Sequence, residues 1–197
     1  MKIEEKSALL VIDIQQEDFK EMDENNMEAP EWNCIRNAKK VLDIFRAKKL
    51  PVIQIKEVHR PDMVDFGREL DGAEGIRCIE TSPYTDYAKL TYPIEGEYLI
   101  SKRRYSAFFG TDLEILLRGL QVDTLYLIGG LTDVCMENAG TILEQKKTRT
   151  IKYSRINRRV LAGVTGINQE SRSIGVGEVL FIQSASVSTM LNILAAL

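Results

Sequence analysis

The sequence predicts an α/β fold in which a mostly parallel central sheet lies between two layers of helices. Short, nearly continuous apolar runs recur along the chain, as buried parallel strands require, and helical patterns separate several of them. The runs occupy residues 8–13, 51–58, 97–102 and 124–130. With 197 residues, 44% of them hydrophobic, the chain suits a single domain spanning residues 1–197.

The segment between the first two predicted strands has the pattern of an amphipathic helix over residues 33–50. Apolar side chains recur there at steps of three and four positions, and basic side chains take the other face. The apolar residues are Ile35, Ala38, Val41, Leu42 and Phe45, and the basic ones are Arg36, Lys39, Lys40, Arg46 and Lys48. A second helix is predicted over residues 111–120, where Thr111 and Glu114 have the spacing of a capping box.

The rest of the chain is less regular. Residues 58–93 contain Gly, Pro, Asp and Tyr without sustained periodicity, which predicts a long excursion over the carboxyl edge of the sheet. A fifth strand has two candidates, at residues 150–156 and 159–164. Residues 178–183 fit either a strand or part of a helix, and residues 187–197 are predicted to be helical.

Composition opposes several classes of protein. A formal net charge of −3 argues against a dedicated nucleic-acid binder, which needs a basic face. The N-terminal segment is charged and is followed by only a short apolar run, which argues against a signal peptide or a membrane span. We therefore expect a cytoplasmic protein whose partner is a small-molecule substrate, with neither nucleic acid nor a membrane bound.

Cysteine and histidine usage limits the possible chemistry. Cys34, Cys78 and Cys135 are odd in number and irregularly spaced, which indicates free thiols rather than disulfides or a zinc site. His59 is the only histidine, and a structural role is the preferred interpretation for it. Unless His59 itself serves, a nucleophile in this chain would therefore use a base other than histidine.

Three side chains that carry chemistry follow predicted strands. Asp13 and Lys102 end the first and third apolar runs, and the fourth run leads through two glycines to Cys135, at the start of a probable helix. Ligands of open parallel sheets bind outside the carboxyl ends of the strands, so an acid, an amine and a thiol would converge there. A lysine ammonium and a helix N-terminus lower the pKa of a thiol, and Asp13 could accept its proton. Backbone N–H groups of the Gly-Gly-Leu-Thr turn would form an oxyanion hole.

Each of these residues also has a plainer interpretation. Cys135 taken alone fits a small buried hydrophobe. Asp13 could cap the turn after its strand, and Lys102 could be a solvated charge in the segment SKRR.

The motifs together resemble the isochorismatase-like cysteine hydrolases, which include nicotinamidases, N-carbamoylsarcosine amidases, ureidoacrylate amidases and biuret hydrolases. ALLVIDIQQEDF resembles the first-strand motif, KRRYSAFFGTDLE the lysine segment, and GGLTDVC the nucleophile segment. The resemblance implies an isochorismatase-like, Rossmann-like three-layer fold and a triad of Asp13, Lys102 and Cys135. It also implies a cis Gly130–Leu131 peptide and an oxyanion hole formed by the N–H groups of Leu131 and Cys135.

The thiol favours hydrolysis of a C–N bond in a small amide, ureido or N-carbamoyl compound through a thioester. Members that hydrolyse isochorismate need no nucleophile and often lack this thiol. An isochorismate-type hydrolase is therefore the alternative that the thiol does not favour. Some nicotinamidase relatives bind a metal through aspartate and histidines; with His59 alone, we expect no metal and no cofactor here.

Candidates for substrate binding are Phe19, Arg60, Arg68 and Arg104, although surface or structural ion pairs are the commoner role of such arginines. The resemblance also implies a homodimer or homotetramer.

The resemblance fades after Cys135. Residues 146–159 contain seven basic residues and no acidic ones, which indicates a solvated or partner-facing segment, or alternatively a phosphate-binding patch. This region also supports two other hypotheses: a non-catalytic binding or assembly protein of the same fold, and a frameshifted stretch over about residues 136–175, which an intact-mass measurement would test. A redox-active thiol protein is a further alternative.

Overall fold

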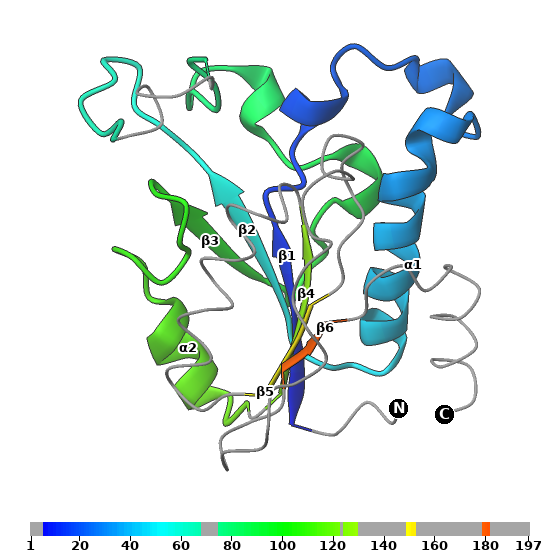
Figure 1. Cartoon of the computed structure of the whole chain (residues 1–197), viewed down its shortest axis with the longest axis vertical. Helices are drawn as coiled ribbons and strands as arrows, with labels where there is room; N and C mark the ends of the chain where they lie inside the picture. Colours follow the sequence, from blue (N-terminus) through cyan, green and yellow to red (C-terminus); the bar gives the residue numbers. More distant parts are fainter. Residues whose placement is uncertain (1–5, 68–74, 123, 130–148, 153–178, 182–197) are drawn as a thin grey trace.

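Six parallel strands form the central sheet of the computed structural model, in the order β3-β2-β1-β4-β5-β6 (Figure 1). The structure describes residues 6–67, 75–122, 124–129, 149–152 and 179–181. The strands are β1 (Ser7–Ile12), β2 (Val52–Glu57), β3 (Tyr98–Lys102), β4 (Thr124–Gly129), β5 (Arg149–Lys152) and β6 (Val179–Phe181). This confirms the predicted α/β class and its parallel sheet.

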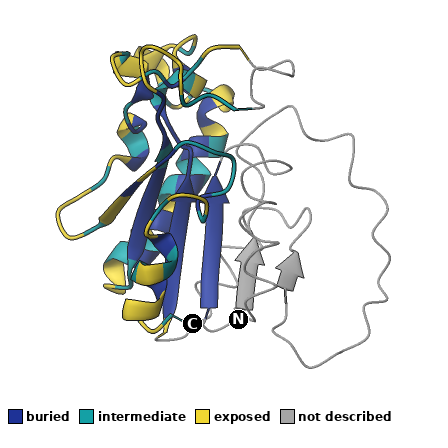
Figure 2. Ribbon diagram, turned by 90° about the vertical axis from the view of Figure 1, so that its left-hand side faces the viewer, coloured by how far each residue is buried: buried dark blue, intermediate teal, exposed yellow. Residues whose placement is uncertain are grey.

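All four predicted apolar runs are strands, with bounds that differ by one or two residues. The three central strands β1, β2 and β4 are almost entirely buried, because helices cover both of their faces. Strand β3 lies at the edge of the sheet and alternates, with Ile100 and Lys102 buried and their neighbours exposed. Figure 2 shows the buried strands as the inner layer of the molecule.

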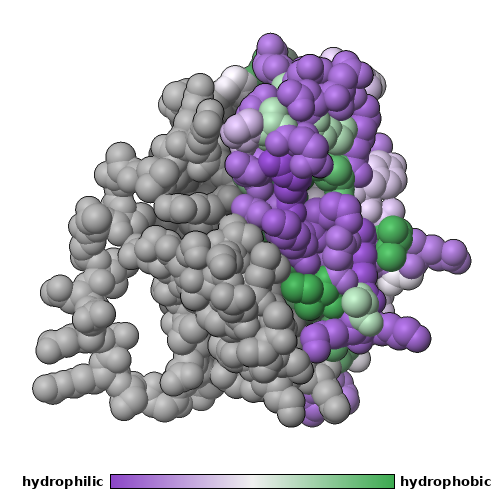
Figure 3. Space-filling model, turned by 90° about the vertical axis from the view of Figure 1, so that its right-hand side faces the viewer, coloured by the Kyte–Doolittle hydropathy of each residue, from purple (hydrophilic) through white to green (hydrophobic). Residues whose placement is uncertain are grey.

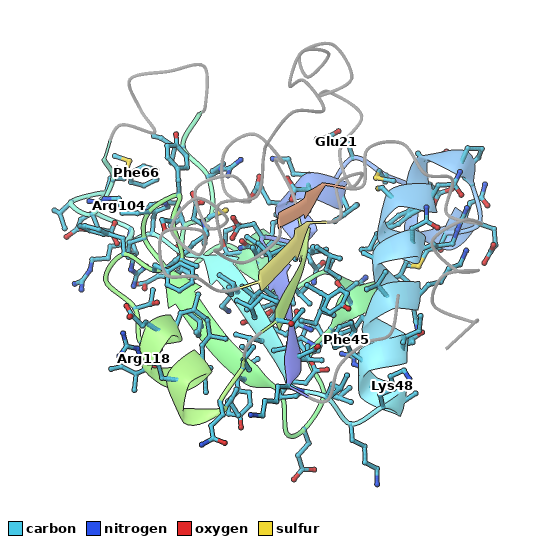
Figure 4. The ribbon with its side chains drawn as sticks, turned by 60° about the horizontal axis from the view of Figure 1, so that its bottom comes forward. Glu21, Phe45, Lys48, Phe66, Arg104 and Arg118 are labelled. Atoms are coloured by element: carbon cyan, nitrogen blue, oxygen red, sulfur yellow. The ribbon has the colours of Figure 1, made fainter. Side chains whose placement is uncertain are left out.

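Two helices cover opposite faces of the sheet (Figure 1). Helix α1 (Asn33–Ala47) buries the predicted stripe against β1, β2 and β4, and its Phe45 ring meets the edge of Tyr126 at 5.2 Å between centroids. Phe45 points from α1 toward the sheet in Figure 4. The opposite face of α1 is hydrophilic, as the space-filling view of that side shows (Figure 3). Burial of both helices thus yields two apolar cores, one on each side of the sheet.

Helix α2 (Leu113–Gly119) packs Leu113 and Leu117 into the second core. It begins two residues after Thr111, the predicted first residue. The Thr111 hydroxyl accepts the Leu113 N–H at 3.2 Å, and the Glu114 carboxylate lies 2.7 Å from Arg118, one turn further along the helix. The capping position is therefore Asp112 rather than Thr111.

The segment between β2 and β3 lies beyond the carboxyl ends of the strands, as predicted (Figure 1). Its described part includes two short 3₁₀ helices, η5 (Pro83–Thr85) and η6 (Lys89–Thr91). The return to β3 is fixed by Glu97, whose carboxylate accepts from Arg46 of α1 at 2.7 Å and from Gln54 of β2 at 3.1 Å. The part around η5 therefore borders the carboxyl edge, and Glu97 fixes the chain where it has returned to the amino end of β3.

Strands β5 and β6 decide between two alternatives left open by the sequence. Strand β5 lies within the first candidate for the fifth strand, apart from Arg149, and residues 179–181 are a strand rather than a helix. The candidate at 159–164, the helix expected at 187–197 and most of the basic segment lie outside the described residues. Within the described part of the chain, no helix is both long and apolar enough to cross a bilayer. The single domain stays a prediction.

Candidate active site

The ends of β1, β2 and β3 bring two carboxylates and one amine together. Lys102 lies opposite Glu57 in the β2–β3 register, and Asp13 follows Ile12, the last residue of β1. The Lys102 Nζ lies 2.9 Å from Asp13 Oδ2 and 2.9 Å from Glu57 Oε2. Lys102 is completely buried, so its ammonium is compensated by these carboxylates rather than by water. The predicted convergence of Asp13 and Lys102 is therefore present.

Asp13 leaves the strand in an unusual backbone conformation. Its φ of 53° lies in the left-handed region, which aspartate enters more readily than most residues but at some cost. The Asp13 N–H still donates to Ile55 O at 2.9 Å, so the strand pairing continues up to the turn. The turn then places the carboxylate at the sheet edge, beside Lys102. Strained residues of this kind often occur at functional sites.

Glu57 was not identified from the sequence, although it occupies the centre of the site. Burial by itself raises the pKa of its carboxyl. The hydrogen bond to His59 and the positive charges of Lys102 and Arg77 outweigh that effect, and they hold the pKa well below its ordinary value. Arg77 Nη2 lies 3.7 Å from Glu57 Oε2. Glu57 is therefore ionised at neutral pH.

Gln15 fixes the backbone of Glu57. Its buried side chain accepts the Glu57 N–H at 2.8 Å and donates to Glu57 O at 2.9 Å and to Thr85 O at 2.7 Å. The amide thereby links the segment after β1 to the last residue of β2 and to η5. This satisfies the backbone groups where the sheet ladder ends.

His59 lies behind Glu57 and is part of the same network. Its Nε2 is 3.1 Å from Glu57 Oε1, and it donates there because an ionised carboxylate only accepts. The ring stacks on Phe66 at 3.9 Å between centroids, and its Nδ1 lies 3.6 Å from Asp65 Oδ1. The structural role expected of His59 is therefore to hold the Glu57 carboxylate in place.

Two further titratable residues lie close enough to feel these charges. Solvent reaches Asp18, yet desolvation by the surrounding protein raises the pKa of its carboxyl to about 6; Arg77 opposes this, and Asp13, Glu17 and Glu57 add to it. Burial raises the pKa of the Cys78 thiol to about 12, and the nearby carboxylates reinforce the shift. Cys78 is therefore a poor nucleophile despite its proximity to the site.

The predicted substrate-binding residues lie in different surroundings. Phe19 is buried and stacks on Trp32 at 5.8 Å, and both rings line a cavity of about 370 Å³ that Asp13, Glu57 and Lys102 do not line. The Arg60 side chain is 60% exposed. Arg104 donates to the carbonyl of Asp65, and Figure 4 shows it beside Phe66 in the loops beyond β2 and β3. In the described part of the chain, Phe19 thus contacts Trp32, and Arg60 and Arg104 both contact Asp65.

Several predicted site residues cannot be placed. Cys135, Leu131 and Arg68, together with the Gly130–Leu131 bond, lie outside the described residues. The last described residue before Cys135 in that segment is Gly129, which lies opposite Ile12 in the register. A Cβ at Gly129 would lie 2.4 Å from the carbonyl oxygen of Ile12, so only glycine fits this close approach. The last described residue on the way to Cys135 therefore lies beside Ile12, which precedes Asp13.

The sequence contained a signal for Glu57. The rule that selected Asp13 and Lys102, namely a polar side chain at the end of an apolar strand, also selects Glu57 at the end of PVIQIKE.

Among the described residues, no group of three or more His, Cys, Asp or Glu side chains is arranged to hold a metal ion. His59 and Glu57 bind each other instead, so the donors described do not fit the metal site of the nicotinamidase relatives. The expectation of no metal stays a prediction.

Comparisons with known proteins agree with this architecture. The family model described as the isochorismatase domain matches residues 7–143. YwoC of Bacillus subtilis, an uncharacterised isochorismatase family protein, is 30% identical over 136 residues, which are 68% of this chain and 68% of that protein. The ureidoacrylate amidohydrolase RutB of Rhizobium rhizogenes is 29% identical over 121 residues, 53% of this chain and about half (49%) of the relative.

Among solved structures, the N-carbamoylsarcosine amidase of Thermoplasma acidophilum superposes with a TM-score of 0.62 at 27% identity. The match covers 77% of this chain and 86% of that chain.

Proposed function

Because the chain belongs to the isochorismatase family, we propose that it hydrolyses a C–N bond in a small amide, ureido or N-carbamoyl compound, with Cys135 as nucleophile. Relatives named ureidoacrylate amidohydrolase, N-carbamoylsarcosine amidase and maleamate amidohydrolase support this class of substrate. The observation that carries the proposal is the 2.9 Å contact between Lys102 and Asp13, buried at the edge where Gly129, six residues before Cys135, lies opposite Ile12.

In the acylation step, the Cys135 thiol transfers its proton to the Asp13 carboxylate, and the thiolate attacks the carbonyl carbon of the substrate. The positive charge of Lys102 stabilises the thiolate. The N–H groups of Leu131 and Cys135 bind the oxyanion that forms. Protonated Asp13 then gives its proton to the departing nitrogen, which leaves as ammonia or an amine, and a thioester remains on Cys135.

In the deacylation step, a water molecule gives a proton to Asp13 and attacks the thioester carbonyl. The C–S bond breaks, the acid product leaves, and the thiolate recovers a proton from Asp13. Asp13 therefore gains and loses one proton in each half of the cycle. Lys102 keeps its proton throughout, because it acts as a fixed charge rather than as an acid.

The proposal is tested by measuring ammonia release from a panel of biuret, N-carbamoyl amino acids, ureidoacrylate, maleamate and nicotinamide. The protein is first matched to its sequence by intact mass, which also tests the frameshift hypothesis. We expect release from at least one compound, its loss in Cys135→Ala and Asp13→Asn, and its retention in Cys34→Ala, a cysteine on α1.

Two outcomes would contradict the proposal. Release that survives Cys135→Ala would remove the thioester mechanism. No release from any compound, by a folded sample of confirmed mass, would favour the non-catalytic alternative. A homodimer or homotetramer remains part of the proposal and is tested by sedimentation of the same sample.

A further inference from the structure

We propose that Glu57 is a positioning residue: it is the permanent counter-ion that keeps Lys102 protonated while Asp13 exchanges its proton with the substrate. The inference rests on the proposed function for its role in the reaction cycle. Its physical core, that Glu57 holds the charge of Lys102, rests on the geometry alone.

The first step concerns the number of charges. Lys102 is completely buried, and two carboxylates, Asp13 and Glu57, lie at the same distance of 2.9 Å from its ammonium. One carboxylate would suffice to neutralise one ammonium. A second buried carboxylate carries a desolvation cost, and the Arg77 guanidinium, 3.7 Å from Glu57, compensates part of it.

The second step concerns the difference between the two carboxylates. Glu57 is held at three points: Gln15 binds its backbone, His59 donates to Oε1, and Lys102 donates to Oε2. Arg77 adds a further positive charge at 3.7 Å. Asp13 lies past its strand in a left-handed turn, and the residue before it, Ile12, lies opposite Gly129. The surroundings of Glu57 thus favour a fixed charge, and the position of Asp13 suits proton exchange.

The third step follows the charges through the cycle. When Asp13 takes the proton of the thiol, its carboxylate becomes neutral and no longer compensates Lys102. Without Glu57, a buried amine would then favour its neutral form, and the thiolate would lose its cationic neighbour. With Glu57 ionised, the Lys102–Glu57 pair is unchanged while the proton moves from sulfur to Asp13.

Other charged groups around Glu57 support this assignment. His59 donates a hydrogen bond to Glu57 and Arg77 adds a positive charge, whereas Asp18 and Asp65 are acidic residues on other segments. Asp13 and Glu57 are the two carboxylates that form ion pairs with Lys102 at 2.9 Å. Glu57 is therefore the group that remains when Asp13 is protonated.

The test replaces Glu57 by glutamine, which keeps the shape and removes the charge. The titration of Lys102 is followed by NMR of protein that contains lysine labelled with ¹³C at Cε, and Lys102→Arg identifies the signal. We expect the midpoint of Lys102 to fall by about one pH unit or more in Glu57→Gln, as the loss of a carboxylate within hydrogen-bond distance implies. The alkaline limb of kcat/KM should move to lower pH by a similar amount.

Glu97→Gln is the matched control. Glu97 is also a largely buried, paired carboxylate, but it precedes β3 at the end opposite Lys102, about 16 Å away along the strand. The substitution Glu97→Gln should destabilise the protein without moving the titration midpoint of Lys102. Glu57→Asp keeps the charge at a greater distance, so its shift should lie between those of the wild type and Glu57→Gln; this variant also serves if Glu57→Gln does not fold.

The two hypotheses fail separately. An unchanged Lys102 midpoint in Glu57→Gln, or in Glu57→Asp if only that variant folds, overturns the role of Glu57 whatever the activity. A wild type that releases no ammonia contradicts the proposed function, and the NMR titration still decides the charge of Lys102. A kcat/KM that falls equally at all pH values, with no shift of the alkaline limb, would reduce Glu57 to a structural role.

Discussion

Replacing Lys102 by methionine tests whether the buried ion cluster contributes to stability as its geometry implies. Methionine has a similar length and no charge, so it fills the space and removes the ammonium. Asp13 and Glu57, each 2.9 Å from the lost nitrogen, would then lose their shared counter-charge in a buried site, while His59 and Arg77 stay beside Glu57. Removing one partner of a buried ion pair costs about 3–5 kcal/mol.

That loss converts into a measurable change in melting temperature. For a chain of this size, 1 kcal/mol corresponds to about 2–4 °C, so the variant should melt about 6–20 °C below the wild type at pH 7.5. Differential scanning calorimetry measures it. Lys48→Met is the control, because Lys48 is exposed at the end of α1 and its removal should change the unfolding free energy by about 0.5 kcal/mol or less (Figure 4).

The sign of the pH dependence gives a second check. In the wild type the pKa of Glu57 is lowered from an ordinary value of 4.5, so its stabilisation is present above that pH and is lost on acidification. In Lys102→Met the carboxylates repel, their pKa values rise, and protonation relieves the penalty at lower pH. The difference between the two melting temperatures should therefore shrink from pH 7.5 to pH 5. Equal melting temperatures, or a difference that grows on acidification, would refute this account of the cluster.

Three further predictions concern the surroundings of the site. Gly129→Ala should destabilise the protein by about 1–3 kcal/mol, because its Cβ would lie 2.4 Å from the Ile12 carbonyl; an unchanged denaturation midpoint in urea would contradict the close approach. The pKa of Asp18 is raised from 3.8 to about 6, so its ionisation opposes folding as pH rises through that range; Asp18→Asn should raise the melting temperature at pH 7.5 and not at pH 4. Burial raises the pKa of the Cys78 thiol to about 12, so Cys78→Ser should leave the thiols that Ellman's reagent labels in the native protein at pH 8 unchanged; one fewer in the variant would show that Cys78 is reactive.

The sheet could be predicted from the sequence because its strands are fully buried. A strand covered on both faces must be apolar at nearly every position, and residues 8–12 and 124–128 contain almost only apolar side chains. The stripe of α1 was equally clear, since Phe45 and Leu42 recur with helical spacing and are fully buried. The start of α2 was harder to predict, because Thr111 and Asp112 are both good capping residues. Local backbone geometry decides which of them takes the N-cap position.

The site was predicted only in part, for a different reason. Asp13 and Lys102 could be placed together because each ends a recognisable strand. The proposed substrate residues could not, because Phe19 is an aromatic side chain after a strand, and nothing in the sequence says whether it faces the site or α1. The structure shows that its ring stacks on Trp32. Phe19 ends the 3₁₀ helix η1 (Gln16–Phe19), Trp32 ends η3 (Pro30–Trp32), and both rings belong to the apolar core that α1 covers.

The position of Glu57 follows from strand order, which a list of strand ends does not contain. The sheet order β3-β2-β1 places β2 between the strands that bear Asp13 and Lys102. With neighbouring strands about 4.8 Å apart, the side chain of Lys102 must pass the end of β2 before it reaches Asp13. Whatever residue ends β2 therefore borders a buried ammonium. An apolar residue there would leave Asp13 as the main counter-charge on the neighbouring strands, whereas a carboxylate such as Glu57 compensates the ammonium independently of Asp13. The sheet order thus makes the end of β2 the natural place for a fixed counter-ion, and a sequence that resembles this one should be inspected there first.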